Sequence, residues 1–273
     1  MEPKLFRSFV ERQMQGHVAQ LLAMRMMMGR VAKQGIVDGD GQVLLDAAAI
    51  DPTLRAYRGD SQGGIMGGTY MALTTDVPRG LLGEPGLPYS LLLDRSVDFD
   101  GFDVLLRLMY SNSIDRQLIV ALVQMMWDKS EPTGYAPYIA SDPLPGTPTH
   151  DVLIHAAIGD HQVSTLGAHI LARAVGAKNL EPLNRPVFGV EAATAPLENE
   201  SVLVEYEFGL DEPDINIPTS EGCDPHDRVR VLTPSYMQQD HFFRTGVVQS
   251  YCDGPCNCDG EGAEAGCAES SCE

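Results

Sequence analysis

Two kinds of hydrophobic pattern follow one another along this chain. Longer stretches with apolar residues at helical spacing predict helices over residues 8–33, 98–129, 163–175 and 235–245. Short apolar runs predict buried strands just before Gly59, after Arg79, over 151–159 and over 201–208. Because strands alternate with helices, we expect an α/β fold with a mostly parallel sheet flanked by helices.

Glycines and prolines mark where several of these elements end. Gly176 follows the helix predicted over 163–175, and Gly246 follows the last predicted helix. Glycine is the residue most often found just past a helix, where the backbone turns left-handed. A connector rich in proline and glycine spans 131–148, and we expect it to be a loop.

Composition predicts a globular protein. Of the 273 residues, 44% are hydrophobic and 21% are charged, which fits one large domain or at most two small ones. The formal net charge of −19 argues against a nucleic-acid partner, because that affinity comes largely from basic residues that neutralise phosphates. The same charge disfavours anionic membrane surfaces. We expect no membrane span, and no secretion signal is visible in the sequence.

The acidic charge and the cysteines are concentrated at the C-terminal end. Six acids and no base lie between Cys252 and Glu273, together with five of the six cysteines. We therefore expect 251–273 to form a flexible acidic tail. The cysteines form no C-x2-C pair, the spacing typical of structural zinc sites, so a zinc site is the least favoured of three interpretations. The other two are disulfides and free thiols. Disulfides would point to an exported full-length protein.

One short motif carries candidate chemistry. Gly59-Asp60-Ser61-Gln62-Gly63 fits the G-x-S-x-G nucleophile elbow, in which a serine projects from a sharp turn between a strand and a helix. Here a strand pattern precedes the motif and a helix pattern follows it. The alternative is a glycine-rich turn with no catalytic role. A trypsin-like reading of Gly-Asp-Ser fails, since only His17 lies upstream of Ser61.

An acid and a histidine follow the motif in the order Ser, Asp, His. Asp160 ends the apolar run 151–159, and His226 lies in the loop after the run 201–208. Because parallel strands end at the same edge of a sheet, we expect the residues that follow them to lie close together. Asp160 could instead cap the next helix. Among the other histidines, His241 is the runner-up for the base.

With these residues the chain resembles the α/β-hydrolase superfamily, in particular its esterase and prolyl-oligopeptidase-like branches. The similarity runs over roughly 50–245, from the elbow with its Gly-rich helix to the strand–acid–helix segment around Asp160. It implies a core of 1–97 and 149–250 with a helical cap insertion over 98–148. It also implies a Ser61–Asp160–His226 triad, with the backbone N–H of Gln62 as an oxyanion donor.

The activity implied by the resemblance is hydrolysis of a small ester, or of a short peptide in a close variant, without any cofactor or metal. The chain departs from the family before the elbow, where only 60 residues precede Ser61. The resemblance therefore implies that this is the C-terminal part of the fold and that its N-terminal strands are missing. Two further expectations follow: an exposed sheet edge through which the protein could associate, and, as the rival function, a non-catalytic interaction module.

Overall fold

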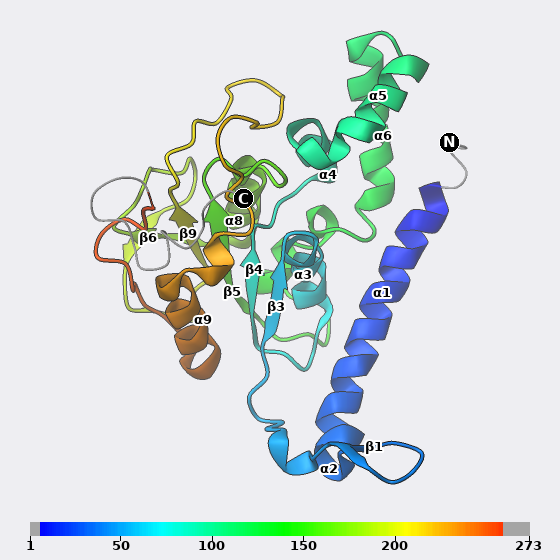
Figure 1. Cartoon of the computed structure of the whole chain (residues 1–273), viewed down its shortest axis with the longest axis vertical. Coiled ribbons are helices and arrows are strands. Elements are labelled where there is room, and N and C mark those ends of the chain that lie inside the picture. Colours follow the sequence, from blue (N-terminus) through cyan, green and yellow to red (C-terminus); the bar gives the residue numbers. More distant parts are fainter. Residues whose placement is uncertain (1–5, 259–273) are drawn as a thin grey trace.

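The computed structural model describes residues 6–258, and its centre is a six-stranded sheet (Figure 1). Every neighbouring pair of strands in this sheet is parallel, as the sequence predicts. In spatial order the strands are β3 (Tyr57–Asp60), β4 (Arg79–Gly83), β5 (Asp151–Ala157), β9 (Val202–Tyr206), β6 (Lys178–Glu181) and β7 (Ala192–Thr194).

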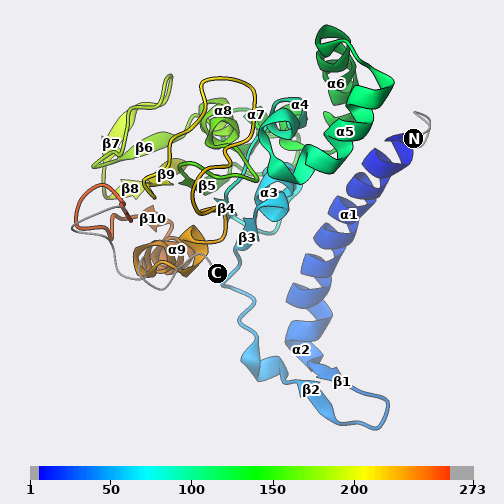
Figure 2. The ribbon, with the colours of Figure 1, turned by 45° about the horizontal axis from the view of Figure 1, so that its top comes forward.

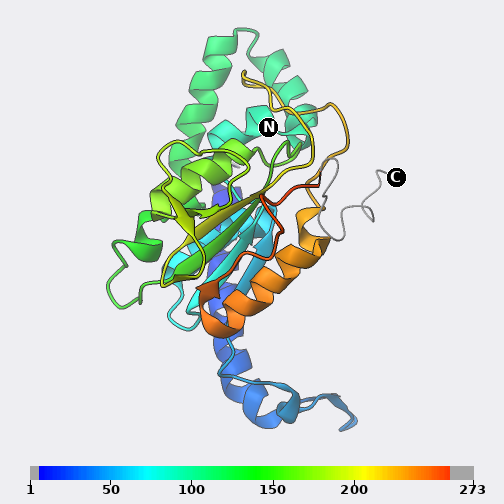
Figure 3. The same ribbon diagram turned by 90° about the vertical axis from the view of Figure 1, so that its left-hand side faces the viewer.

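Helices cover both faces of this sheet. Figure 3 shows α8 and α9 on opposite sides of it. The longer helices are α1 (Phe6–Met26), α3 (Gln62–Leu73), α5 (Asp100–Met109), α6 (Ser113–Trp127), α8 (Thr165–Val175) and α9 (Thr233–Thr245). Three short ones are α2 (Ala32–Gln34), α4 (Tyr89–Leu92) and α7 (Pro137–Ala140). Gly176 and Gly246 end α8 and α9 with φ of 73° and 78°, which confirms both predicted helix ends.

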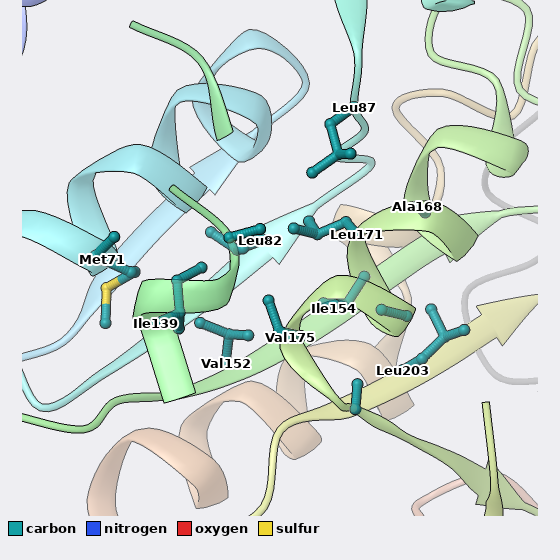
Figure 4. Packing of buried hydrophobic residues seen from close by; sticks show 14 of the residues in the cluster. Met71, Leu82, Leu87, Ile139, Val152, Ile154, Ala168, Leu171, Val175 and Leu203 are labelled. Carbon is teal, nitrogen blue, oxygen red and sulfur yellow. The ribbon is translucent and has the colours of Figure 1, made fainter. Parts of the chain in front are cut away.

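Successive residues along each strand supply the two halves of the core. On one face, Leu82, Ile154 and Leu203 pack beneath α3, α7 and α8 (Figure 4). On the other face, their neighbours Leu81 and Leu153 pack with residues of α9. This two-sided burial explains why the strands are continuous apolar runs, since a strand covered on both faces has no solvent side for polar residues.

The sequence did not predict the shorter strands. These are β6, β7 and four strands outside the main sheet, which form two small two-stranded sheets: β1 (Ile36–Val37) with β2 (Val43–Leu45), and β8 (Leu197–Glu198) with β10 (Val247–Val248). Most have exposed or half-buried residues, so they lack the apolar run by which a buried strand is recognised. Their pairing comes from tertiary contacts rather than from local pattern.

Helix α1 and its hairpin project from the body. The helix predicted over 8–33 is confirmed as α1, a π-helical turn at Met27–Val31 and α2. Figure 2 shows α1 running past α3 and carrying the β1–β2 hairpin beyond the end of the sheet. Large apolar side chains on this unit are exposed, among them those of Phe9, Val18, Leu22, Val43 and Leu44.

The strand that leads to Ser61 lies at the edge of the sheet. Within residues 6–258, β3 pairs with β4 alone. The segment 98–148, expected to be a helical insertion, lies within the connection between β4 and β5 and contains α5, α6 and α7. Many apolar side chains of α5 and α6 are exposed, including those of Leu108, Ile114 and Met125. The described part of the chain therefore has a free sheet edge and an uncovered apolar surface.

The start of the acidic tail packs onto the body. Glu207, just past β9, donates its N–H to the Cys256 carbonyl oxygen at 2.9 Å and accepts from the Cys258 N–H at 2.7 Å. A disulfide joins Cys252 to Cys256. Cys223 and Cys258 are also disulfide-bonded, which for these four cysteines favours the disulfide reading. Cys267 and Cys272 lie outside the described residues, so the expectation of a flexible tail is untested there.

A buried histidine on β5 links the stability of the fold to pH. The His155 ring is buried against α9, where its Nε2–H donates to Gln238 Oε1 at 2.7 Å and its Nδ1 accepts from the Ser235 hydroxyl. Burial lowers the pKa of His155 to about 4. The unfolded chain therefore binds a proton near pH 6.5 that the folded chain takes up only near 4.

We expect this histidine to destabilise the fold as pH falls from 6.5 to 4. The shift corresponds to on the order of 3 kcal/mol of unfolding free energy, present above pH 6.5 and lost below pH 4. Urea unfolding of the wild type and of His155→Gln over this range measures it. The free energy of unfolding of the wild type, relative to that of His155→Gln, should fall towards pH 4. If the difference between the two proteins stays constant over this pH range, His155 is not the group that titrates.

Candidate active site

Ser61 lies on a sharp turn between β3 and α3. Its φ of 59° is in the left-handed region, which is uncommon for residues other than glycine. The turn is held by the Ser61 N–H, which donates to the Gly83 carbonyl oxygen of β4 at 2.8 Å. Gly59 passes so close to Gly63 that a Cβ on Gly59 would lie 2.3 Å from the Gly63 carbonyl oxygen. This is the strand–turn–helix context that the G-x-S-x-G pattern requires.

Gln62 begins helix α3 directly after the serine. The first N–H groups of a helix have no acceptor within the helix, and the helix dipole makes this end favourable for negative charge. The Gln62 backbone N–H is therefore suited to an anion that forms beside Ser61. Its side chain is engaged elsewhere, since Nε2 donates to the Tyr89 hydroxyl oxygen.

Asp160 follows β5 and is almost completely buried. Its Oδ1 accepts hydrogen bonds from the backbone N–H groups of Gln162 and Val163, both at 2.8 Å. Oδ2 is directed to a histidine instead. Asp160 therefore shapes the turn that precedes α8, while the helix itself begins with Ser164 as its N-cap residue. Oδ1 thus holds the turn before α8, and Oδ2 is left for a role in a site, so the two roles do not exclude each other.

His226 is the histidine that contacts this carboxylate. Its Nδ1–H donates to Asp160 Oδ2 at 2.8 Å, and both side chains are buried. Asp224 orders the loop, because its Oδ1 accepts from the backbone N–H groups of His226 and His161. Burial alone lowers the pKa of His226, but the hydrogen bond and the charge of Asp160 raise it above the usual value. Burial raises the pKa of the Asp160 carboxyl, and the bond to His226 opposes that rise.

The sheet topology explains how these residues come to the same edge. Strands β3, β4, β5 and β9 are parallel neighbours, so the segments that follow them start on one side of the molecule. Asp160 and His226 are 66 residues apart in sequence and are brought into contact. Among the described residues no hydrogen bond joins the Ser61 hydroxyl to His226. In enzymes without substrate such bonds are often long or poorly aligned.

The runner-up histidine lies elsewhere. His241 is on α9, and its ring packs edge-on against Tyr251 with 6.1 Å between the centroids. Its carbonyl oxygen accepts from the Thr245 hydroxyl within the helix. No hydrogen bond to Asp160 involves His241 in the part of the chain that the structure describes. The geometry favours His226 over His241 as the partner of Asp160.

Two charged residues near this edge were not singled out from the sequence. Glu84 directly follows β4, and Arg230 lies four residues after His226; they form an ion pair at 3.0 Å. The sequence could have indicated Glu84 as a site residue, because it directly follows a predicted apolar strand, as Ser61 and Asp160 do. Nothing in the local sequence indicates that Arg230 is its partner.

Two cavities of the described residues have walls that do not include Ser61, Asp160 or His226. One of about 260 Å³ lies between α5, α6 and the segment Asn216–Pro218, and includes Asp94, Phe99 and Arg107. Another of about 520 Å³ is lined by residues that follow β5 and β9, such as Ile158, Ser164 and Leu210. Trp127 of α6 is buried in a small core with Val10 and Tyr89.

No protein-family model, curated protein or solved structure matches this chain. Among residues 6–258, no cluster of three or more histidine, cysteine or acidic side chains could hold a metal ion. The same residues include no helix with the length and hydrophobicity that crossing a membrane would require. The fold is α/β, and the function has to be argued from the site itself.

Proposed function

We propose that this chain is a serine hydrolase that cleaves carboxylic esters through an acyl-enzyme intermediate. The observation that carries the proposal is the buried Asp160–His226 hydrogen bond of 2.8 Å, at the sheet edge where Ser61 occupies a strained turn. A serine becomes a nucleophile when an imidazole oriented by a carboxylate accepts its proton, and this chain places such an imidazole on the same sheet edge as a serine in a strand–helix turn.

Each side chain has a distinct task in this proposal. Ser61 Oγ attacks the ester carbonyl carbon, and His226 Nε2 accepts the hydroxyl proton. Asp160 holds the imidazole with its proton on Nδ1 and stabilises the imidazolium that forms. The Gln62 N–H donates to the oxyanion of the tetrahedral intermediate. His226 then protonates the leaving alcohol, and a water molecule releases the acid by the same steps in reverse.

The proposed reaction involves only these groups and a water molecule. An amide can enter the same sequence if His226 protonates the leaving amine, so short peptides are the close alternative to small esters. Esters are favoured because an alkoxide leaves more easily than an amide nitrogen. A weak oxyanion site, with one donor identified, would therefore limit ester cleavage less severely than peptide cleavage.

Covalent labelling tests the nucleophile directly. We expect a fluorophosphonate probe to add one phosphonyl group to the wild type and none to Ser61→Ala, because the probe reacts only with an activated hydroxyl. Intact mass spectrometry measures the adduct, and peptide mapping locates it.

A matched control for labelling is Ser96→Ala, a serine outside the proposed site that caps a short helical turn. This variant should be labelled like the wild type. Equal labelling of the wild type and Ser61→Ala would rule out Ser61 as the nucleophile.

A specific observation supports the rival function, an interaction module without catalysis. The free edge of β3 and the exposed apolar side chains of α1, α5 and α6 form a surface that monomeric proteins usually cover. If the wild type fails to react with the probe but associates at micromolar concentration in sedimentation experiments, this rival is favoured over the hydrolase.

A further inference from the structure

Glu84 occupies an unusual position at the carboxyl edge of the sheet. It is the first residue after β4, between the strand that leads to Ser61 and the strand that leads to Asp160. Its φ is 42°, in the left-handed region that favours glycine. A non-glycine residue persists in such a conformation only when its surroundings hold it there, and such residues are concentrated at functional sites.

The backbone around Glu84 joins two neighbouring strands to this position. The Glu84 N–H donates to the His155 carbonyl oxygen of β5 at 2.8 Å. The preceding carbonyl oxygen, that of Gly83, accepts the Ser61 N–H at 2.8 Å. The end of β4 therefore contacts the turn of the proposed nucleophile on one side and the strand of the proposed acid on the other.

The Glu84 side chain extends this link to a third segment. Its carboxylate is completely buried, and Oε2 accepts from Arg230 Nε at 3.0 Å. Arg230 also bonds Oδ1 of Asp227, the residue after His226 in the same loop. The buried atoms Glu84 Oε1 and Arg230 Nη2 have no hydrogen-bond partner among the described protein groups. A buried ion pair with unsatisfied atoms stabilises a fold poorly, so stability alone gives little reason for this one.

We propose that Glu84 is a positioning residue that, through Arg230, fixes the His226 loop against the end of β4 and so keeps the imidazole facing Ser61. The inference rests on the proposed serine hydrolase function. Glu84 contacts neither the substrate nor the reacting atoms in this scheme. Its contribution is to join the loop of the base to the strand end that already holds the nucleophile.

The charges around Glu84 give the pair a second effect on His226. Burial raises the pKa of the Glu84 carboxyl, Arg230 and His226 oppose that rise, and Asp60 of β3 adds to it. In the 3.0 Å ion pair with Arg230, Glu84 carries a negative charge. Toward His226, the charges of Asp160 and Glu84 favour the protonated imidazole, whereas Arg230 disfavours it. Glu84→Gln removes one favourable charge and leaves the Arg230 charge uncompensated, so it should lower the pKa of His226.

Two measurements on the same variants test the proposal. The first is the titration of the His226 ring by proton NMR, assigned by comparison with His226→Gln. The second is the rate at which a fluorophosphonate labels Ser61. For Glu84→Gln we expect a lower His226 pKa and labelling slowed on the order of tenfold, since a displaced base reduces the rate steeply. For Arg230→Gln we expect slower labelling without a lower His226 pKa, and Arg230→Lys should recover part of the rate.

Glu131→Gln is the matched control. Glu131 is another buried carboxylate whose pKa is raised first by burial, but it bonds Gln124 and Thr133, away from His226. It should change neither measurement. Wild-type titration and labelling in Glu84→Gln would overturn the proposal. If that variant does not fold, a wild-type labelling rate in Arg230→Gln would overturn it. If the wild type itself is not labelled, the hydrolase proposal fails, and the NMR titration alone decides whether Glu84 acts on His226.

Discussion

Replacing His226 with alanine is expected to reduce kcat/KM for a small ester by about 10⁴-fold while leaving the fold intact. The loss follows from the geometry, because His226 is the histidine hydrogen-bonded to the buried Asp160 carboxylate. Without the imidazole, nothing accepts the Ser61 proton or returns it to the leaving group. Initial rates on a p-nitrophenyl ester, with far-ultraviolet circular dichroism as the check on folding, measure the effect.

His241→Ala is the matched control for this prediction. His241 is half-buried on α9 and packs against Tyr251, so its loss should leave kcat/KM within about twofold of the wild type. Activity that survives in His226→Ala but disappears in His241→Ala would reverse the assignment of the base. It would also imply that α9 moves toward Asp160 in the active protein.

The pH dependence of kcat/KM for the same ester measures the pKa of the general base independently. His226 acts only when neutral, and its pKa is raised above the ordinary imidazole value by Asp160 despite the opposing effect of burial. The acid limb of kcat/KM should therefore lie above pH 6.5, the ordinary pKa of a histidine side chain. An acid limb below that pH would show that the charge of Asp160 does not reach the base.

Gly59→Ala is expected to destabilise the protein by about 3 kcal/mol and to displace Ser61. The added Cβ would lie 2.3 Å from the Gly63 carbonyl oxygen and 2.4 Å from the Tyr57 hydroxyl, which itself donates to that carbonyl at 2.7 Å. The atoms around the added Cβ cannot move away easily, because backbone lies on one side and a hydrogen-bonded ring on the other. Overpacking of this kind costs about 1–3 kcal/mol or more. Urea unfolding and the labelling rate of Ser61 measure the two effects.

Gly63, the second glycine of the motif, is the matched control, because a Cβ at this position would not clash with its surroundings. A Cβ on Gly63 would have the Tyr57 hydroxyl, 4.0 Å away, as its nearest neighbour. Gly63 lies inside α3, where alanine is favoured over glycine by about 1 kcal/mol. Gly63→Ala should therefore keep or increase stability. If both alanine variants unfold at the same urea concentration, the close approach at Gly59 does not determine the shape of the turn.

The sequence by itself determined the α/β class and the local shape of the elbow. Continuous apolar runs such as 151–157 identify strands covered on both faces, because burial on both sides requires apolar residues at every position. The turn at Ser61 could also be predicted from the sequence, since its glycines and the helix after it are local features. Likewise Gly176 and Gly246 identified the ends of α8 and α9 from their own neighbourhood.

The tertiary structure decided what depends on residues far apart in the chain. The sequence offered His226 and His241, and only the packing of the loop after β9 beside β5 brings one of them within 2.8 Å of Asp160. The Glu84–Arg230 pair, 146 residues apart, left no local signal because an ion pair requires proximity and no particular spacing. For the same reason the short strands β6 and β7 were missed: their residues become a sheet only because β9 provides an edge on which β6, and then β7, can pair.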